Sequence, residues 1–208
     1  PKGVVYSHKT TYLHALASRA TDTFGICEAD RLLLLPPMFH ANSWGMPYSG
    51  WFSGSDLIMP GPHVQPDKLV RLIGSERPTF SAMVPTVLGD LLRMPEDELD
   101  MRCFRLLVSG GSAVPPAMID AVRERWGVPL LQGWGMTETS PMCVLSHPPR
   151  DLGGVPESSW RARSGRPVPG IEVRAVGDDG KPVPCDGETV GELQLRGPWV
   201  TGAYHGID

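Results

Sequence analysis

Cysteine is scarce in this sequence, and its scarcity excludes several common kinds of site. The four cysteines stand far apart, and no Cys-x-x-Cys pair or tight cluster of cysteine and histidine occurs. A structural zinc site and a disulfide framework are therefore not expected. We predict instead that the cysteines are reduced thiols of a cytoplasmic protein: Cys27, Cys103, Cys143 and Cys185.

Long apolar runs and an excess of positive charge are also missing. The longest uninterrupted apolar run, residues 32–35, is far too short to span a bilayer. With a formal net charge of −4 and a pI of about 5.9, the chain lacks the basic surface that nucleic-acid binding requires. The sequence opens on Pro1, with neither a methionine nor a signal peptide, which indicates a fragment of a longer protein.

What is present is the composition of an ordinary globular domain, 41% hydrophobic and 20% charged. Glycine (24 residues) and proline (22 residues) punctuate the hydrophobic segments without forming repeats, which predicts many loops and not disorder. The acidic stretch at residues 96–100 is interpreted as a solvated loop, because charge runs usually face water.

Alternating helical and strand patterns predict an α/β fold, with a largely parallel sheet covered by helices on both faces. Helices are expected at residues 8–20, with Ser7 as N-cap, and at 66–74, 86–93 and 115–126. Strands are expected at residues 32–35, 56–59, 79–84, 105–108 and 129–131. Residues 38–54 lack clean periodicity and are expected to form a pocket-lining loop or a short helix.

After about residue 160 the pattern changes. Residues 171–176 and 191–196 alternate in the manner of strands and are separated by glycine-containing turns. We therefore expect a small β-rich subdomain at residues 161–208, following an α/β core at residues 1–160.

Two glycine-rich turns follow predicted parallel strands, at residues 109–113 and 133–135. Ligands bind such sheets at the carboxyl ends of the strands. Glycines there either let the backbone approach a flat base or a phosphate, or merely permit a sharp turn, and the residues alone leave both interpretations open. Neither turn fits a dinucleotide-binding fingerprint or the nucleophile elbow of a hydrolase.

The second turn leads directly into a hydroxyl and a carboxylate, at Thr137 and Glu138. Thr137 can donate a hydrogen bond to a phosphate oxygen. Glu138 can supply an oxygen ligand to Mg²⁺, a hard cation.

Together these motifs resemble those of the adenylate-forming superfamily, which includes acyl-CoA synthetases, luciferases and the adenylation domains of peptide synthetases. Residues 132–139, Gln-Gly-Trp-Gly-Met-Thr-Glu-Thr, are similar to its signature. Residues 1–8 resemble the end of its phosphate loop, residues 109–113 its adenine-side loop, and residues 191–204 the strand pair of its small β subdomain, a distorted barrel.

The resemblance implies a role for each matching position. Lys2 would be the loop lysine near the pyrophosphate, Thr137 would touch the phosphates, and Glu138 would be the magnesium ligand. The adenine would be framed by Gly111, Ser112, Ala113, Gln132 and Gly133. Trp134 stands where a tyrosine is more common, and it is either a ring that packs on the purine or a core aromatic.

Residues 37–48 resemble the medium- and long-chain fatty-acid–CoA ligases and their methylthiopropionate-activating relatives. In that branch His40 would border the acyl and CoA sites, and Trp44 would lie beside the acyl tunnel, although a lone histidine is usually structural. An apolar tunnel gains about 0.8 kcal/mol for each methylene removed from water. A row of side chains suited to such a lining is Met38, Phe39, Trp44, Met46 and Tyr48.

The implied function is ATP-dependent activation of a carboxylic acid, a fatty acid or a methylthio-alkanoate, to acyl-AMP and then acyl-CoA. ATP, Mg²⁺ and CoA would take part, and the catalytic candidates are Lys2, His40, Thr137 and Glu138. The expected partners are the acid and CoA, with no nucleic acid and no transmembrane segment, and a homodimer is a candidate assembly of the full-length protein.

Three expected parts of such an enzyme are missing from the sequence: the serine/threonine–glycine run before Pro1, the ribose-binding Thr-Gly-Asp motif after residues 206–208, and the C-terminal lid with its lysine. We therefore expect negligible ligase activity from the 208 residues alone. Two alternatives remain open, a non-catalytic remnant that binds nucleotide or acyl groups and an adenylation enzyme that loads a carrier protein.

Overall fold

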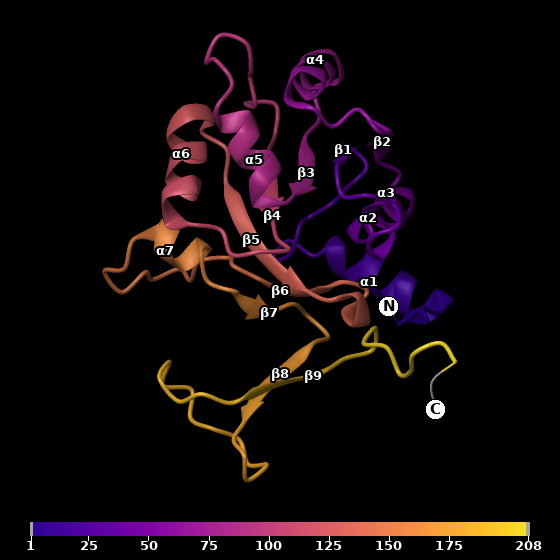
Figure 1. Ribbon diagram of the computed structural model, residues 1–208, viewed down its shortest axis with the longest axis vertical. Coiled ribbons are helices and arrows are strands. Elements are labelled where there is room, and N and C mark those ends of the chain that lie inside the picture. The colour runs from indigo at the N-terminus through magenta and orange to yellow at the C-terminus, as the bar shows by residue number, and fades with distance from the viewer. Residues whose placement is uncertain (1, 207–208) are drawn as a thin grey trace.

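A seven-stranded sheet runs through the centre of the computed structural model, which describes residues 2–206 (Figure 1). The strand order is β2-β1-β3-β4-β5-β6-β7; β1 to β5 pair in parallel, and β6 and β7 pair antiparallel. The strands are β1 Arg31–Leu34, β2 Asp56–Ile58, β3 Phe80–Met83, β4 Leu106–Ser109, β5 Leu130–Gly135, β6 Met142–Leu145 and β7 Arg166–Pro167. The predicted α/β fold with a largely parallel sheet is confirmed. Pro1, Ile207 and Asp208, which belong to the predicted phosphate-loop and ribose-motif regions, lie outside the described residues.

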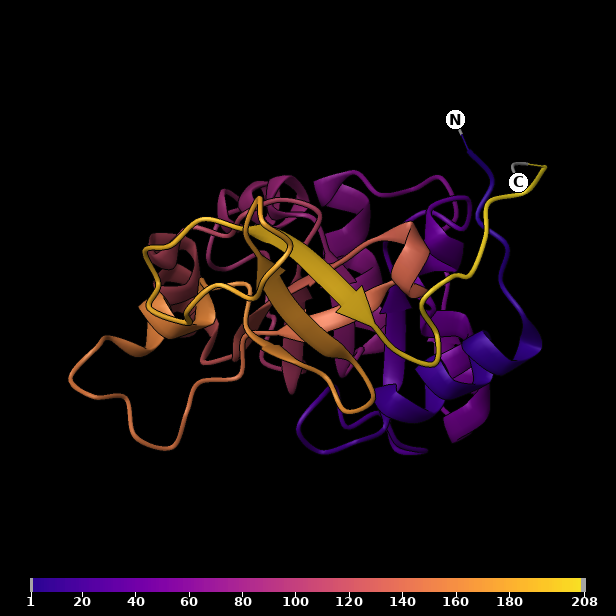
Figure 2. The ribbon, with the colours of Figure 1, turned by 90° about the horizontal axis from the view of Figure 1, so that it is seen from below.

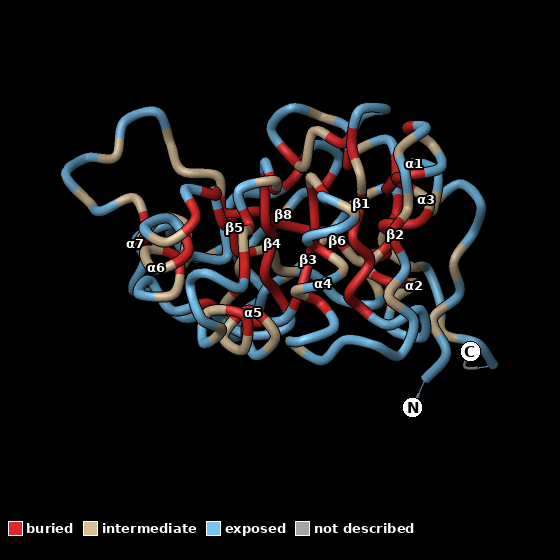
Figure 3. The backbone as a smooth tube through the Cα atoms, turned by 90° about the horizontal axis from the view of Figure 1, so that it is seen from above, coloured by how far each residue is buried: buried red, intermediate tan, exposed pale blue. Residues whose placement is uncertain are grey.

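Helices cover both faces of this sheet, as predicted. They are α1 His8–Ser18, α2 Ala41–Trp44, α3 Met46–Ser53, α4 Pro66–Glu76, α5 Pro85–Leu92, α6 Pro116–Trp126, α7 Glu157–Arg161 and the 3₁₀ turn η1 Thr137–Thr139. Buried side chains of α4, α5 and α6 share one core, whereas α3 contributes to the core on the other face and α1 packs on α3. Figure 3 shows that the buried backbone follows the strands between these layers.

The leucine run of β1 shows why a parallel strand in the middle of a sheet has apolar residues at successive positions. Successive side chains of a strand point to opposite faces. Leu33 therefore joins the core under α4, α5 and α6, while Leu32 and Leu34 join the core on the α3 side. Because helices bury both faces, the strand needs apolar residues at every position and not only at alternate ones.

Local sequence signals fix the starts of several helices. Ser7 caps α1, since its Oγ accepts from the Thr10 N–H at 3.1 Å while its own N–H donates to Thr10 Oγ1 at 3.0 Å. Proline occupies the first turn of α4, α5 and α6, where its missing N–H costs nothing. No helix within residues 2–206 is long and apolar enough to cross a membrane.

The largest departure from the sequence prediction is at β5. A strand was expected at residues 129–131, but β5 continues to Gly135, so the glycine motif is itself a strand. Gly133 lies opposite Leu145 and Trp134 opposite Val144 in the antiparallel ladder with β6, a strand that was not predicted. Pairing across the sheet thus overrides the low strand propensity of glycine. The expected helix at residues 8–20 also ends early, at Ser18.

The predicted β-rich region is a two-stranded antiparallel sheet of β8 (Glu172–Val176) and β9 (Glu192–Arg196). Figure 2 shows this hairpin lying across the main body of the protein. Ile171 and Trp199 belong to a third buried cluster that includes residues of β6. Because β7 pairs with β6, the large sheet extends to Pro167, and the division at residue 160 stays a prediction.

His14 ties α1 to two other parts of the structure. Its Nε2 accepts a hydrogen bond from the N–H of Met142 at 3.1 Å, and its ring packs edge-on against Trp199 with the centroids 6.3 Å apart. A Cβ on Gly45 would lie only 2.7 Å from the same ring, so a side chain there would displace it. Burial lowers the pKa of His14 from 6.5 to about 4.

Folding stability is expected to decline as the pH falls from 6.5 towards 4. The unfolded chain takes up a proton on His14 near pH 6.5, whereas the folded protein does so only near pH 4. The stabilisation is therefore complete above pH 6.5, and up to about 3 kcal/mol of it is lost across this window. Urea unfolding at a series of pH values measures the decline. His14→Gln should flatten the profile, whereas His8→Gln, at an exposed position, should not; an equally steep profile in His14→Gln would rule out this origin.

Candidate functional site

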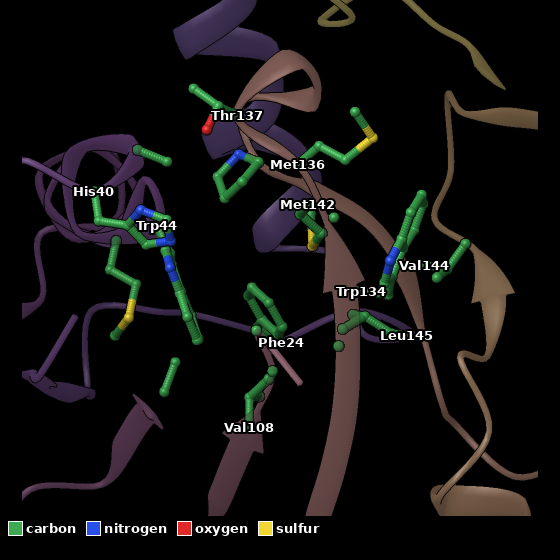
Figure 4. Close-up of a pocket in the computed structure, with 18 residues that line it drawn as sticks. Phe24, His40, Trp44, Val108, Trp134, Met136, Thr137, Met142, Val144 and Leu145 are labelled. Carbon is green, nitrogen blue, oxygen red and sulfur yellow. The ribbon is translucent and has the colours of Figure 1, made fainter. Parts of the chain in front are cut away.

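A pocket of about 320 Å³ opens at the carboxyl ends of β4 and β5. Its walls are mainly apolar, and His40 and Thr137 are the polar side chains that line it. In Figure 4 the rings of Trp44 and Trp134 stand on opposite sides of the pocket, with His40 and Thr137 towards one end and Val108 towards the other. Most of the apolar lining comes from Phe24, Trp44, Met46, Val108, Met142 and Leu145.

Glycines at the ends of β4 and β5 let the backbone come close to the ring of Trp44. A Cβ on Gly110 would lie 2.6 Å from the carbonyl oxygen of Gly133 and 3.8 Å from Trp44. Gly111 has a φ of +81°, a conformation that side chains with a Cβ rarely adopt, and it lies beside the same ring. The two glycine-rich turns therefore meet on one side of the pocket, next to the Trp44 ring.

Gln132 does not line the pocket; it holds the neighbouring loop in place. The residue is buried, and its Oε1 accepts the N–H of Val114 at 2.6 Å. Its own N–H donates to Ser146 Oγ at 2.7 Å, which joins β5 to the residue that follows β6. Ser112 and Ala113 are exposed and also lie outside the pocket lining. Their predicted contact with adenine, and that of Gln132, stay predictions.

The predicted row of acyl-lining side chains is only partly assembled. Trp44 and Met46 line the pocket, but Met38, Phe39 and Tyr48 do not, and Phe39 is 92% exposed. The cause is α2, where all residues from Ala41 to Trp44 have φ between 45° and 55°. This left-handed turn changes the direction of the chain, so the side chains before it, such as Phe39, do not point into the pocket that Trp44 and Met46 line. His40 and Trp44 remain adjacent, with ring centroids 6.4 Å apart.

Thr137 and Glu138 form a turn that is held on both sides by segments distant in sequence. The Tyr6 hydroxyl donates to the Thr137 carbonyl at 2.6 Å, and the Thr201 N–H donates to the Glu138 carbonyl at 2.7 Å. The side chain of Glu138 accepts the Tyr204 hydroxyl on Oε1 at 2.7 Å. Burial, with the nearby charge of Glu138 and a smaller effect of Tyr48, raises the pKa of Tyr6 to about 12, so Tyr6 remains a donor.

Lys2 reaches the same place because the first and last described segments pair with each other. Val4 and Tyr204 form an antiparallel bridge, and the N–H of His205 donates to the Gly3 carbonyl at 2.7 Å. Figure 2 shows the two segments side by side. The Lys2 ammonium then lies 4.9 Å from the centre of the Tyr204 ring.

The structure therefore brings some of the predicted residues together and leaves others apart. His40, Trp44, Gly111, Gly133, Trp134 and Thr137 line one pocket. Lys2 and Glu138 both contact Tyr204, and neither residue lines that pocket. Sequence reasoning missed the parts played by Tyr6, Tyr204 and β6. Only the apolar run at residues 142–145 could have indicated β6, because the two tyrosines act through contacts that no local pattern records.

Glu138 and its surroundings suit a magnesium ion that also binds phosphate. No group of three or more His, Cys, Asp or Glu side chains able to enclose a metal occurs within residues 2–206. Mg²⁺ does not need one, since it is commonly held by one or two carboxylates together with water and substrate phosphates. Oε1 of Glu138 accepts Tyr204, whereas Oε2 accepts no hydrogen bond from the described residues. One carboxylate oxygen of Glu138 is thus available for such an ion.

Comparison with known proteins points to one family. Residues 1–205 match the family model described as AMP-binding enzyme. A long-chain-fatty-acid–CoA ligase of Thermus thermophilus is 43% identical over 212 residues, covering 99% of this chain and 39% of that protein. A 3-methylmercaptopropionyl-CoA ligase of Ruegeria pomeroyi is 39% identical over 208 residues, covering 98% and 39%. The N-terminal domain of FACL13 from Mycobacterium tuberculosis has a TM-score of 0.84 at 27% identity, covering 100% of this chain and 50% of that one. The chain thus spans 39% of the length of these two curated relatives.

Proposed function

The chain belongs to the family of AMP-binding enzymes, and on that premise we propose that it forms the nucleotide site and the adjoining acyl site of an AMP-forming acid–thiol ligase. The observation that carries the proposal is the single pocket in which the glycine turns, Thr137, His40 and Trp44 converge. A nucleotide and an acid must lie side by side for adenylation, and these residues supply a surface for each. The names of the two curated relatives favour a fatty acid or a methylthio-alkanoate as substrate.

In the first half-reaction a substrate carboxylate oxygen attacks the α-phosphorus of ATP, and pyrophosphate leaves. Catalysis of this kind rests on positioning and on neutralising charge. Lys2 would balance the charge of the leaving pyrophosphate, and the Thr137 hydroxyl would donate to a phosphate oxygen. Glu138 would hold Mg²⁺, which when bound withdraws charge from the phosphates. In the second half-reaction the CoA thiol attacks the acyl carbon, and AMP leaves.

The apolar part of the pocket is suited to the hydrocarbon end of the acid. Trp44, Met46 and Val108 form a surface from which water is displaced, and each buried methylene contributes about 0.8 kcal/mol. His40 lies at the boundary between this surface and Thr137, consistent with a position near the reacting carboxylate.

A pyrophosphate-release screen tests the proposal. The complete gene product that contains this chain is incubated with MgATP and straight-chain acids of two to eighteen carbons. Release is expected only in the presence of an accepted acid, followed by acyl-CoA formation when CoA is added. Release without acyl-CoA would instead favour transfer to a carrier protein. No release with any acid would contradict adenylation and favour a non-catalytic remnant.

Replacing Trp44 by alanine is expected to change acid preference more than it slows adenylation of a short acid. Removing the ring enlarges the apolar side of the pocket, so the ratio of kcat/KM between long and short acids should shift on the order of tenfold. The measurement is the same screen on Trp44→Ala. The matched control is Trp51→Ala on the outer side of α3, where the tryptophan is 67% exposed. An unchanged profile in Trp44→Ala would remove Trp44 from the acyl site.

A further inference from the structure

Tyr204 contacts the two groups of opposite charge beside η1, the Lys2 ammonium and the Glu138 carboxylate. We propose that Tyr204 is a positioning residue that keeps these charges apart and orients each towards MgATP. The inference rests on the proposed function, because it concerns how the same site is prepared for its metal–nucleotide ligand.

The contacts of Tyr204 separate the two charges with two different parts of one side chain. Its hydroxyl donates to Oε1 of Glu138 at 2.7 Å. The face of its ring lies 4.9 Å from Nζ of Lys2. Glu138 and Lys2, both within the described residues, form no ion pair with each other.

The backbone fixes Tyr204 at this place independently of its side chain. Its bridge to Val4 joins it to the segment that carries Lys2. Three residues earlier, Thr201 donates its N–H to the carbonyl of Glu138 at 2.7 Å. Thr201 Oγ1 also donates to the Val5 carbonyl at 3.3 Å. The tyrosine is thus anchored both to the lysine segment and to the carboxylate turn.

Separation matters because a direct Lys2–Glu138 ion pair would neutralise both groups. Such a pair would have to break before Lys2 could face phosphate or Glu138 could face a cation. An exposed ion pair is individually weak, whereas a hydrogen bond to a charged acceptor and a cation–π contact together satisfy both groups without cancelling their charges. The tyrosine also leaves Oε2 of Glu138 without a hydrogen bond from the described residues.

The test measures ATP binding to the complete gene product by calorimetry over a series of Mg²⁺ concentrations. Tyr204→Phe keeps the ring and removes the hydroxyl, and it should raise the Mg²⁺ concentration for half-maximal binding by at least about tenfold, as expected for loss of one hydrogen bond to a charged group. Tyr204→Leu also removes the ring, so it should raise that concentration further. A crystal structure of ligand-free Tyr204→Leu should then show Lys2 paired directly with Glu138.

A matched control and two contrary outcomes keep the inference distinct from the proposed function. Tyr12→Phe removes the hydroxyl of an exposed tyrosine on α1 and should leave the Mg²⁺ midpoint unchanged. The inference is overturned if unsubstituted protein binds MgATP and both Tyr204 variants, folded by circular dichroism, show the same midpoint. If the unsubstituted protein binds no MgATP, the proposed function fails and the inference fails with it.

Discussion

Glu138→Gln is expected to lower the rate of pyrophosphate release by at least about 100-fold, the order of effect seen when a group that stabilises transition-state charge is removed. A neutral amide is a poor ligand for Mg²⁺, whereas the carboxylate of Glu138 offers one oxygen beside Tyr204. The amide can still accept the Tyr204 hydroxyl, so the turn should remain in place. The measurement is acid-dependent pyrophosphate release by the complete gene product, at saturating ATP and over a range of Mg²⁺ concentrations.

Two controls separate loss of the metal ligand from loss of the fold. Glu124→Gln makes the same chemical change on the exposed side of α6, and it should release pyrophosphate at the unsubstituted rate. The urea midpoint of Glu138→Gln should lie close to that of the unsubstituted protein. A release rate in Glu138→Gln within a few-fold of normal would mean that another group holds the metal.

The second large effect is expected at the amino ends of the parallel strands, where the buried Asp30 immediately precedes β1. Its two carboxylate oxygens accept from Arg105 Nη2 at 2.6 Å and Nε at 2.7 Å. The same oxygens accept the Thr79 hydroxyl at 2.7 Å and the Cys27 N–H at 3.0 Å. Burial alone would raise the pKa of Asp30, but these hydrogen bonds and the Arg105 charge together lower it. Through these hydrogen bonds Asp30, which precedes β1, is joined to Thr79 before β3 and to Arg105 before β4.

Asp30→Asn is expected to lower the free energy of unfolding by about 2 kcal/mol, because the partly solvated guanidinium of Arg105 loses its hydrogen bonds to a buried carboxylate. Urea unfolding at pH 7 measures the change, and Asp22→Asn, at an exposed position, should have little effect. The sign of the pH dependence also follows. Since the folded pKa of Asp30 lies below 3.8, its stabilisation is complete above pH 3.8 and is lost as the pH falls through the lower, folded value. A loss below about 1 kcal/mol at pH 7 would show that the pair is not structurally important.

The parallel part of the fold could be predicted because its signals are local. The leucines of β1 and the proline-initiated helices α4, α5 and α6 carry their own patterns of burial and capping. β6 could not be predicted in the same way, because it is a short apolar run whose pairing partner is the glycine motif itself. A strand containing Gly133 and Gly135 has little intrinsic preference for extended structure, and only the finished sheet selects it.

The site was predictable to a similar and limited extent. Residues that belong to continuous motifs, such as Thr137 and Glu138, could be named as candidates from their order alone. The left-handed turn of α2 could not be anticipated, because it contains no glycine and L-residues disfavour this conformation by about 1–2 kcal/mol each. Its consequence, that Phe39 turns outward while Trp44 lines the pocket, was therefore beyond the sequence.

The pairing of the first and last described segments has a consequence for the order in which the protein folds. The contacts that hold the carboxylate turn join residues 131 positions apart, from Tyr6 to Thr137, and 66 positions apart, from Glu138 to Tyr204. Closing such long intervals costs chain entropy that only an already formed sheet can offset. The contacts around Glu138 should accordingly form late in folding. They should also be lost early in unfolding, while the hydrophobic core of the sheet is still intact.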